Sequence, residues 1–355
     1  MSLLVVAMSG GVDSSVAAAL MLAEGHEVLG VTMVTVSPPV SLPPLTEQVL
    51  EAGRVCRHLG IPHQVLDLRE SFAFEVIGNF LEEYRRGRTP NPCSRCNSRI
   101  KFGVFLEKVR ALGVETLVTG HYARLRPDPE TGRVRLLRGL DPHKDQSYFL
   151  AGLRQDQLAA ACFPIGGLPK KRVREIAGEL GLPVAEKADS QDLCFVSARG
   201  KEAFLRKSLG PGSPGPILDR AGRFLGTHPG LESFTPGQRR GLGVCGSERL
   251  YVLELDVARN ALILGREESL LHQEMEVGDM NWLVEEPVRR ARVQFRSTSR
   301  GDMAALNILP DGRVRVRFDH PQRALCPGQC AVFYRRDEVL GGGLIVRAGA
   351  GCETP

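Results

Sequence analysis

A loop near the start of the chain, Ser9 to Ser15, has the residue types of a phosphate-binding site. Its two glycines, Gly10 and Gly11, let the backbone turn sharply and bring N–H groups close to a ligand. The apolar run Leu3 to Met8 predicts a strand before the loop, and the helix formers Val16 to Glu24 follow it. A helix N-terminus here would add the positive end of its dipole, so we expect an anion to bind. The loop lacks the Gly-Lys-Ser/Thr of the Walker loop and the G-x-G-x-x-G of dinucleotide folds. The plain alternative is a turn that only joins strand to helix.

Two cysteines form a C-x-x-C pair in the proline-rich segment Arg88 to Asn97. Cys93 and Cys96 come just before an expected helix. A thiol near a helix N-terminus has its thiolate stabilised by the helix dipole, which lowers the thiol pKa and makes it a nucleophile or a metal ligand. We expect this above all of Cys96. Cys194 follows an Asp-Ser-Gln-Asp turn about a hundred residues later, and periodicity alone does not bring it together with Cys96.

The chain has nine cysteines, which in a reducing compartment argue against a structural disulfide framework. The N-terminal apolar run has no signal-peptide features, so we expect a cytoplasmic, reducing location. Cys326 and Cys330 lie close together in an expected β region, but no second pair completes a zinc set. The remaining four are expected to be small buried hydrophobes or surface thiols: Cys56, Cys162, Cys245 and Cys352.

The composition of the 355-residue chain, 43% hydrophobic and 25% charged, is typical of a soluble globular protein. This length predicts two or three domains. No apolar stretch reaches the roughly 18 residues of a membrane span, so we expect no membrane partner. The net charge of +5 excludes a saturating polycation. Basic clusters would suit RNA phosphates, although each taken alone is typical of solvated surface. The clusters are Arg85-Arg86-Arg88, Lys170-Lys171-Arg172, Arg239-Arg240 and Arg289-Arg290-Arg292.

Strand and helix patterns alternate through the first half of the chain, which predicts a parallel sheet covered on both faces. The expected strands are 3–8, 27–36, 62–67 and 115–119, and the expected helices are 14–24, 46–59, 71–86 and 98–112. Ligands of such sheets bind at the carboxyl ends of the strands. This rule places Ser9 to Ser15, Met33 and the Thr119 to Tyr122 turn around one crevice. The proline-rich segment Ser37 to Pro44 is expected to be a loop over it.

Beyond about Gly200 the pattern changes to short strands separated by turns. A segment rich in glycine and proline, 210–216, precedes β-like runs at 249–255 and 260–264. From about residue 270 the chain reads as all β, with runs at 288–295, 313–318 and 330–334 that alternate in part between apolar and polar residues. These runs predict a small C-terminal barrel.

The loop Ser9 to Ser15 resembles the pyrophosphate loop (PP-loop) of the N-type ATP pyrophosphatases. In that superfamily ATP activates a carbonyl oxygen as an adenylate and pyrophosphate leaves. Further motifs, in order and over nearly the whole chain, resemble those of the bacterial tRNA-specific 2-thiouridylases. They are Arg88 to Asn97, Thr119 to Arg124, Lys144 to Leu150, Asp189 to Phe195, Gly237 to Gly243, and Pro327 to Gln329 followed by Gly341 to Gly343. The resemblance implies an α/β parallel-sheet PP-loop domain of the adenine-nucleotide alpha-hydrolase type at 1–202. It also implies a small β-rich central tRNA-binding domain at 203–268 and a C-terminal β-barrel at 269–355.

The resemblance further implies ATP-dependent transfer of sulfur to carbon 2 of the wobble uridine, position 34, in the tRNAs for glutamate, lysine and glutamine. Cys194 would carry the sulfur as a persulfide, and Cys96 would release it by forming a disulfide with Cys194. The sulfur would arrive from a persulfide relay or a cysteine desulfurase system. Mg²⁺ is expected on the phosphates, with Asp13 as a catalytic residue and its indirect partner.

The resemblance also assigns binding residues. Those implied to lie against ATP are Ala7, Met8, Ser9, Gly10, Gly11, Val12, Asp13, Ser14, Met33 and Gly120. Those implied to contact tRNA are His121, Lys144, Asp145, Gln146, Gln294, Phe295 and Gln329. For His121, a role as a core or nucleotide-side histidine is an equal alternative.

Two departures from the family pattern open alternatives. Many members have an aspartate where this chain has Cys93, so Cys93, Cys96 and Cys194 make a three-thiolate set for a four-iron four-sulfur cluster, which would replace the persulfide route. Zinc in the same site is a weaker reading. In addition, Val34 to Pro44 replaces a segment rich in tryptophan and acidic residues, and Gln294-Phe295 replaces an Arg-Tyr pair.

Two other functions compete with thiolation. Another PP-loop enzyme, such as a thiolase for a different tRNA position or an amide-forming ligase, would share the Ser9 to Ser15 loop, but a ligase would not need Cys96 and Cys194. A non-catalytic RNA-binding module would keep the fold without the chemistry. The intact loop and both cysteines argue against that module.

Overall fold

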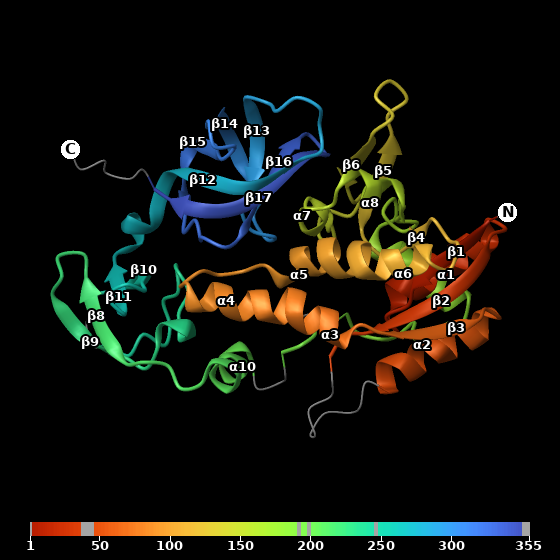
Figure 1. Ribbon diagram of the computed structural model, residues 1–355, viewed down its shortest axis with the longest axis horizontal. Coiled ribbons are helices and arrows are strands. Elements are labelled where there is room, and N and C mark those ends of the chain that lie inside the picture. Colours follow the sequence, from red (N-terminus) through yellow and green to blue (C-terminus); the bar gives the residue numbers. More distant parts are fainter. Residues whose placement is uncertain (1, 37–45, 190–192, 197–199, 245–247, 350–355) are drawn as a thin grey trace. The chain divides into compact units, whose positions relative to one another are not determined.

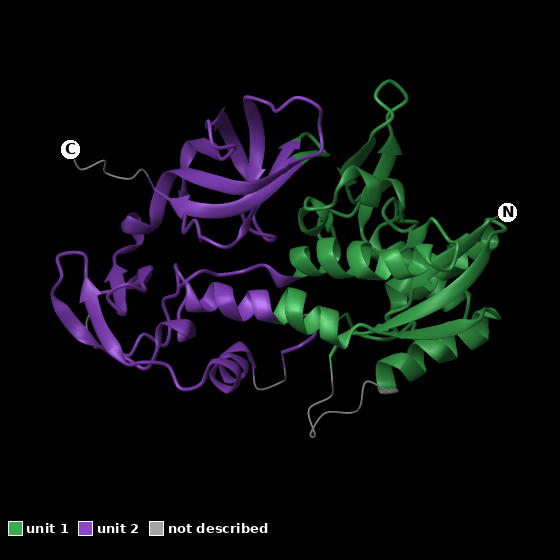
Figure 2. Ribbon diagram, in the orientation of Figure 1, with its two compact units in different colours: residues 1–77, 93–191, 335–340 green, residues 78–92, 192–334, 341–355 purple. Residues whose placement is uncertain are grey.

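The computed structural model describes residues 2–36, 46–189, 193–196, 200–244 and 248–349. The loop expected at Ser37 to Pro44 therefore lies outside the described residues. Cys245 and Cys352 lie outside them too. The chain divides into two compact units (Figure 1, Figure 2). Unit 1 comprises residues 1–77, 93–191 and 335–340, and unit 2 comprises residues 78–92, 192–334 and 341–355. In the described ranges, no helix has the length and apolar character needed to cross a membrane.

Within its described residues, unit 1 has a five-stranded parallel sheet with strand order β3-β2-β1-β4-β7. Val5 and Val6 of its central strand are fully buried, as expected for a parallel strand covered on both faces. Three helices pack against the sheet through one apolar core that includes Val16, Val55 and Val173. The parallel sheet expected from the sequence is confirmed. The bounds are β1 (Leu3–Ala7), β2 (Glu27–Val34), β3 (His63–Asp67), β4 (Leu117–Val118), β7 (Ala161–Cys162), α1 (Val12–Ala23), α2 (Thr46–Leu59) and α9 (Lys170–Glu179).

The helices expected at 71–86 and 98–112 are both present, but each includes a π-helical stretch between α-helical turns. The first consists of α3 (Arg69–Phe72), the π-helix η1 (Ala73–Gly78) and α4 (Asn79–Arg85). The second consists of α5 (Pro92–Arg95), the π-helix η2 (Cys96–Phe105) and α6 (Leu106–Arg110). It starts six residues earlier than expected, because Pro92 needs no N–H partner in a first turn. Gly103, with φ −101° and ψ −109°, interrupts η2. Apolar spacing carries no signature for i→i+5 hydrogen bonds, so the wider turns were not expected.

Unit 1 also contains a β-hairpin that was not expected from the sequence. It consists of β5 (Ala123–Pro127) and β6 (Val134–Arg138), and Glu338 pairs with Leu137 of β6. Arg124 on this hairpin forms an ion pair with Asp337 at 2.6 Å. The run of arginines between single apolar residues is too short to show a strand period. Two short helices, α7 (Ser147–Leu150) and α8 (Gln155–Ala159), follow the hairpin.

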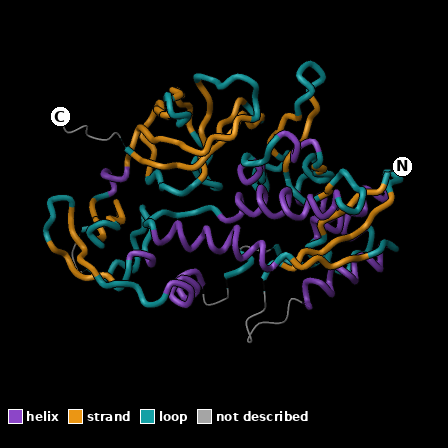
Figure 3. Tube along the Cα trace, in the orientation of Figure 1, coloured by secondary structure: helices purple, strands orange, loops and turns teal. Residues whose placement is uncertain are grey.

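Residues 215–265 of unit 2 contain a sheet with strand order β10-β11-β8-β9. Figure 3 draws the strands of the chain in orange. Ile217, Val252 and Leu262 are fully buried in its core. The helix α10 packs through Leu205 against Phe80 of α4. The bounds are α10 (Gly200–Leu209), β8 (Gly215–Asp219), β9 (Phe224–His228), η3 (Leu231–Ser233), β10 (Tyr251–Asp256), β11 (Ala261–Gly265) and η4 (Glu267–Leu270).

The last part of unit 2 is a β-barrel, as expected. Its strands follow the order β12-β15-β14-β13-β16-β17, and β17 pairs back with β12. In β15, Val314, Val316 and Phe318 are buried and alternate with exposed arginines, because successive side chains of a strand point to opposite faces. The bounds are β12 (Leu271–Trp282), β13 (Arg290–Gln294), β14 (Asp302–Ile308), β15 (Val314–Arg323), β16 (Cys330–Arg335) and β17 (Glu338–Ala348). The domain limits expected at residues 202 and 268 remain predictions.

Candidate functional site

The glycine loop connects β1 directly to α1. Gly10 has a φ of +67°, and a Cβ atom there would lie 2.8 Å from the carbonyl oxygen of Gln48, so both backbone conformation and space require glycine. Gly11 is the N-cap of α1 and has no side chain to bond the first-turn N–H groups. The hydroxyl groups of Ser14 and Ser15 donate instead to the Gly11 carbonyl oxygen, at 3.2 and 2.8 Å. This helix N-terminus therefore suits a bound phosphate group.

The predicted ATP-binding residues gather at the carboxyl ends of β2, β1 and β4, which are neighbours in the sheet. Met33 lies near the end of β2, and Gly120 follows β4. A Cβ atom on Gly120 would lie 2.7 Å from the carbonyl carbon of Asp13 and the nitrogen of Ser14, so this glycine lets the turn contact the loop. The side chains of Ala7, Met8 and Val12 are buried, so these residues can offer only backbone groups to a nucleotide. The ATP contact that the resemblance implies for them fits that role.

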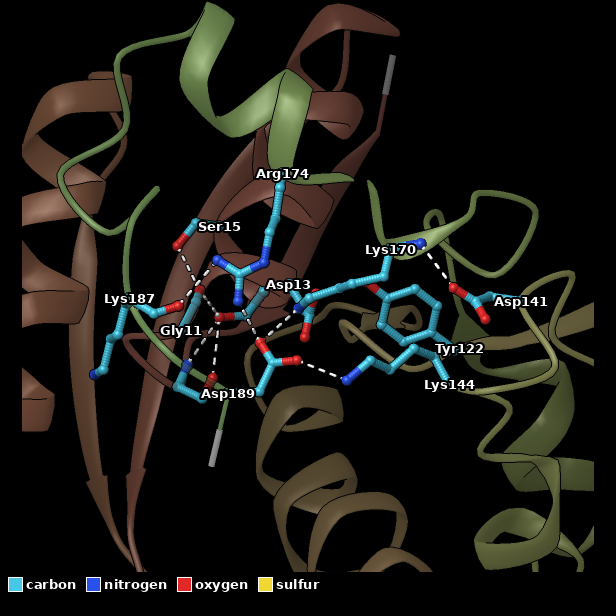
Figure 4. Close-up of polar contacts among 12 residues, drawn as sticks. Gly11, Asp13, Ser15, Tyr122, Asp141, Lys144, Lys170, Arg174, Lys187 and Asp189 are labelled. Atoms are coloured by element: carbon cyan, nitrogen blue, oxygen red, sulfur yellow. Dashed lines mark hydrogen bonds and ion pairs between the residues drawn. The ribbon is translucent and has the colours of Figure 1, made fainter. Parts of the chain in front are cut away.

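A charged network begins at Asp13, the acidic residue of the loop (Figure 4). The Oδ1 atom of Asp13 accepts hydrogen bonds from the Lys170 ammonium group and from the Tyr122 hydroxyl group, both at 2.7 Å. Lys170 is buried at the start of α9 and also pairs with Asp189, at 3.0 Å. Burial, together with the hydrogen bond to Asp13, raises the pKa of Tyr122, so this hydroxyl group stays protonated. Lys170 thus bridges two carboxylates beside the predicted phosphate site.

Asp189 collects three cations. Besides Lys170, it pairs with Lys144 at 2.7 Å and with Arg174 at 2.8 Å. Its partial burial acts to raise the pKa of Asp189, but the hydrogen bonds and charges of Lys144 and Lys170 outweigh burial and lower that pKa to about 2. The carboxylate is therefore ionised at neutral pH and holds these three cations together beside the predicted phosphate site.

A fourth cation, Lys187, contacts the glycine loop. The Lys187 ammonium group donates to the Gly10 carbonyl oxygen at 3.0 Å and forms an ion pair with Glu51. This bond occupies the carbonyl side of the loop. Lys187 and Glu51 thereby hold the loop from its carbonyl side.

Two of the three consecutive residues predicted to contact tRNA hold their own turn together. Asp145 pairs with Arg138 at 2.7 Å and accepts hydrogen bonds from the backbone and hydroxyl group of Ser147. The side chain of Gln146 accepts a hydrogen bond from the Tyr122 backbone at 3.0 Å. Lys144, whose side chain is one-third exposed, pairs with Asp189. The turn is therefore built around Asp145 and Gln146, and Lys144 is its cation.

His121 is buried in unit 1 between Phe102 and Phe163. Its Nε2 atom lies 3.3 Å from the Lys101 ammonium group, and its Nδ1 atom lies 2.6 Å from the Thr119 hydroxyl group. An ammonium group can only donate, so Nε2 accepts and the ring proton is on Nδ1. Burial, with the nearby Lys101 charge, lowers the pKa of His121 well below its ordinary value. The ring is thus neutral at physiological pH and fixes Lys101.

The cysteines differ in their surroundings. Cys93 is exposed and Cys96 is half-buried, while Cys194 is exposed in unit 2. Burial raises the pKa of Cys96, although Lys101 acts to lower it. The expectation of a lowered pKa was therefore wrong. The helix begins at Pro92, so Cys96 lies beyond the first turn, where the dipole is strongest. No disulfide occurs among the residues that the structure describes.

The three barrel residues predicted to contact tRNA are engaged within unit 2. Gln294 is buried and donates to the carbonyl oxygens of Arg296 and Ser297 at 3.1 and 3.2 Å. Phe295 is buried against Phe318. Gln329 donates to two carbonyl oxygens of the loop that leads to Cys93.

The predicted metal cluster finds no group of ligands to hold it in the described part of the chain. There, no three His, Cys, Asp or Glu side chains come together as a metal site. Cys93 and Cys96 belong to unit 1 and Cys194 to unit 2. The cluster remains a prediction from the sequence pattern.

Several residues of the network were not singled out as site residues from the sequence. Lys170 was noted only within a basic cluster, and Tyr122, Arg174 and Lys187 were not assigned a binding or catalytic role. Tyr122 falls inside a recognised motif, which was the one available signal. No local pattern could have marked the others, because Lys170 lies 157 residues from its partner Asp13.

Family models match the chain over three stretches. They are a tRNA methyl transferase HUP domain over residues 2–198, a tRNA methyl transferase PRC-barrel domain over 202–266 and an aminomethyltransferase beta-barrel domain over 272–345. A solved 4-thiouridine synthetase bound to RNA and ATP is 21% identical, covering 58% of this chain and 49% of that one, with a TM-score of 0.35. That likeness is too weak to assign a function or a cofactor.

Curated relatives match over nearly the full length. The tRNA-specific 2-thiouridylase MnmA of Pelotomaculum thermopropionicum is 44% identical, covering 97% of each chain. The protein of the same name from Moorella thermoacetica is 47% identical, covering 96% of this chain and 98% of its own. The chain therefore belongs to the family of tRNA-specific 2-thiouridylases and is a tRNA sulfurtransferase.

Proposed function

We propose that this enzyme replaces the carbon 2 oxygen of the wobble uridine, position 34, with sulfur in the tRNAs for glutamate, lysine and glutamine. The observation that carries the proposal is the glycine loop at the N-terminus of α1, flanked by the Asp13–Lys170–Asp189 bridge. Such a site suits a polyphosphate, and the full-length similarity to tRNA-specific 2-thiouridylases supports a uridine of tRNA as the nucleoside substrate. ATP and tRNA are then two substrates of the reaction, and the sulfur donor is the third.

The first step is adenylation of the uridine. The carbon 2 oxygen attacks the α-phosphate of ATP, the bond to the β-phosphate breaks, and pyrophosphate leaves. This turns a poor electrophile into a carbon with AMP as its leaving group. In our proposal the loop N–H groups and Lys170 bind the polyphosphate, because both present positive charge at the carboxyl edge of the sheet. Mg²⁺ is expected to accompany ATP and to neutralise part of its charge, with Asp13 as its indirect partner.

The second step moves sulfur. A donor, either a persulfide relay or a cysteine desulfurase system, leaves Cys194 as a persulfide. Its outer sulfur forms a bond to carbon 2, and AMP departs with the original oxygen. The Cys96 thiolate then attacks the inner sulfur of Cys194. The sulfur–sulfur bond to the substrate breaks and leaves its electron pair on the substrate sulfur, so 2-thiouridine and a Cys96–Cys194 disulfide result. An external thiol must reduce that disulfide before another turnover.

The test combines two assays on the purified enzyme with glutamate tRNA. Pyrophosphate release reports adenylation, and retardation of the tRNA in a mercury-containing gel reports thiolation. We expect Cys96→Ser and Cys194→Ser to abolish thiolation from a persulfide donor, and Cys162→Ser, a substitution in β7, to leave it intact. Thiolation that survives in the Cys96→Ser, Cys194→Ser double variant would contradict the proposal, whereas an amide-forming activity that survives there would favour a ligase-like PP-loop enzyme.

Two further outcomes separate the alternatives. A protein that binds tRNA but releases no pyrophosphate with any of the three tRNAs would be a binding module without chemistry. Iron and sulfide analysis after anaerobic purification distinguishes the cluster route. If thiolation follows bound iron and is lost in Cys93→Ser, three thiolates hold a cluster and the persulfide route is wrong. Full activity of iron-free protein and of Cys93→Ser would support the persulfide route.

A further inference from the structure

The barrel turn Pro327 to Gln329 binds the chain just before the C-x-x-C pair, and both segments belong to unit 2. The Thr89 N–H group donates to the Pro327 carbonyl oxygen at 2.9 Å. The Gln329 amide nitrogen donates back to the Thr89 carbonyl oxygen at 2.8 Å and to that of Pro90 at 3.3 Å. Both backbone polar groups of Thr89 are therefore bound by this turn, so its position is set by the barrel.

The turn itself is anchored and fits closely. The Gly328 N–H group donates to the Ile345 carbonyl oxygen, and the Ile345 N–H group donates to the Gln329 carbonyl oxygen, both at 2.8 Å. Gly328 has a φ of +90°, and a Cβ atom there would lie 3.0 Å from the Thr89 nitrogen and oxygen and from Arg88 Cβ. A Cβ atom at 328 would thus press against the bound segment, which would have to shift by a few tenths of an ångström. These contacts make the turn a fixed part of the barrel rather than a loose neighbour.

The bound segment has few means of holding itself. Pro90 and Pro92 have no N–H groups, so the stretch cannot form a regular backbone ladder. Its carbonyl oxygens need donors from elsewhere, and Pro90 is buried where water is excluded. Upstream, Arg88 is fixed by Glu83 of α4, through the Glu83 carbonyl oxygen and an ion pair. Downstream, Pro92 begins α5, which carries Cys93.

We propose that Gln329 is a positioning residue for the cysteine helix, and that its amide acts on Thr89 and Pro90 rather than on tRNA. Only two residues separate Pro90 from Cys93, so a shift of this segment is passed on to the start of α5. The inference goes beyond the tRNA contact implied for Gln329 and rests on the proposed role of Cys96 in sulfur release. If the inference holds, the Gln329 amide makes residues 86–92 more rigid. The rate of sulfur transfer then depends on this rigidity.

The experiment compares Gln329→Ala and Gln329→Glu with Gln322→Ala. Glutamate keeps the shape of glutamine but offers no N–H group to a carbonyl oxygen. Gln322 is a matched control, because its amide bonds Asp302 and the His320 carbonyl oxygen in the same barrel. Hydrogen exchange of the peptide covering residues 86–97 is measured by mass spectrometry. Single-turnover thiolation, pyrophosphate release and the Kd for tRNA are measured on the same proteins.

We expect exchange in that peptide to be at least about fivefold faster in both Gln329 variants and unchanged in Gln322→Ala, since the Thr89 N–H bond loses its support. The rate of single-turnover thiolation should fall about tenfold in both Gln329 variants, because the loss of a hydrogen bond displaces the cysteine helix. The rate of pyrophosphate release should change less than about twofold in both variants. The tRNA Kd of Gln329→Ala should also change less than about twofold. Unchanged exchange would overturn the inference. So would a rise in the tRNA Kd of Gln329→Ala that matches its loss of thiolation.

The same data separate this inference from the proposed function. If Cys96→Ser keeps thiolation, the proposed sulfur release is wrong, and the exchange result still decides whether Gln329 holds the segment. If Cys96→Ser is inactive but exchange in Gln329→Ala is unchanged, the proposed function stands and the positioning role is refuted.

Discussion

Replacing Asp189 by asparagine should show how much the cation network contributes to unit 1. The carboxylate lies between the ammonium groups of Lys144 and Lys170 and the guanidinium group of Arg174, at 2.7, 3.0 and 2.8 Å. Asparagine has nearly the same shape as a protonated aspartate. The substitution therefore removes the charge and leaves three cations facing one another without their shared anion.

The magnitude follows from the pKa of Asp189. It falls from 3.8 to about 2 on folding, and one pKa unit corresponds to about 1.4 kcal/mol, which gives an upper value of about 2.5 kcal/mol. The carboxylate is one-quarter exposed, so solvent screening reduces the expected loss to about 1–2 kcal/mol in the free energy of unfolding at pH 7. A lowered folded-state pKa stabilises the fold above the unfolded-state value. The difference between the two proteins should therefore hold above about pH 5 and shrink by about half near pH 3.

The assay is urea unfolding followed by far-ultraviolet circular dichroism, at pH 7 and again near pH 3. Asp67→Asn is the control, because the pKa of Asp67 is also lowered to about 2, by hydrogen bonds from Arg69, yet about half of each side chain of the pair is exposed. Its effect should be smaller and should vanish in high salt, since exposed charges are screened. An Asp189→Asn protein as stable as wild type at pH 7, or a loss that stays the same at pH 3, would refute the reasoning.

Three further predictions concern the loop and the buried histidine. Gly120→Ala should lower thiolation at least about tenfold and weaken ATP binding, because a Cβ atom would lie 2.7 Å from the Asp13 backbone; unchanged ATP affinity in a calorimetric titration would contradict this. Lys187→Met should raise the KM for ATP severalfold with a smaller change in kcat, since it frees the Gly10 carbonyl oxygen at the loop, and steady-state kinetics would show it. Because burial and Lys101 lower the pKa of His121 well below its ordinary value, the ring should stay neutral from pH 6 to 8; its NMR signals should not titrate there, and a midpoint near 6.5 would exclude the neutral ring.

Local patterns were enough for the elements that carry the nucleotide site. A buried strand, two glycines and a run of helix formers predicted β1, the loop and α1 within a few residues, because each depends on neighbours in the chain. The parallel sheet followed from the alternation of such elements. Patterns failed where the backbone departs from the ordinary helix. The π-helical turns of η1 and η2 and the early start at Pro92 have no signature in apolar spacing.

The roles of individual polar residues depended on distant partners. His121, Gln294 and Gln329 were assigned to tRNA by resemblance, yet their side chains are engaged by Lys101, by the Arg296 carbonyl oxygen and by Thr89. The raised pKa of Cys96 was also missed. Burial of a thiol is a property of the packed helix, and the helix-dipole argument alone pointed the other way.

The sequence by itself determined the family, the layered sheet with its phosphate-binding loop, and the cysteines available for sulfur chemistry, because these depend on residue type and short-range order. Only the tertiary structure decided which charges meet. Asp13 and Lys170 are 157 residues apart, and Thr89 and Gln329 are 240 apart, in the chain. Contacts over such separations form only when the whole unit packs, since burial and excluded water make these pairings favourable.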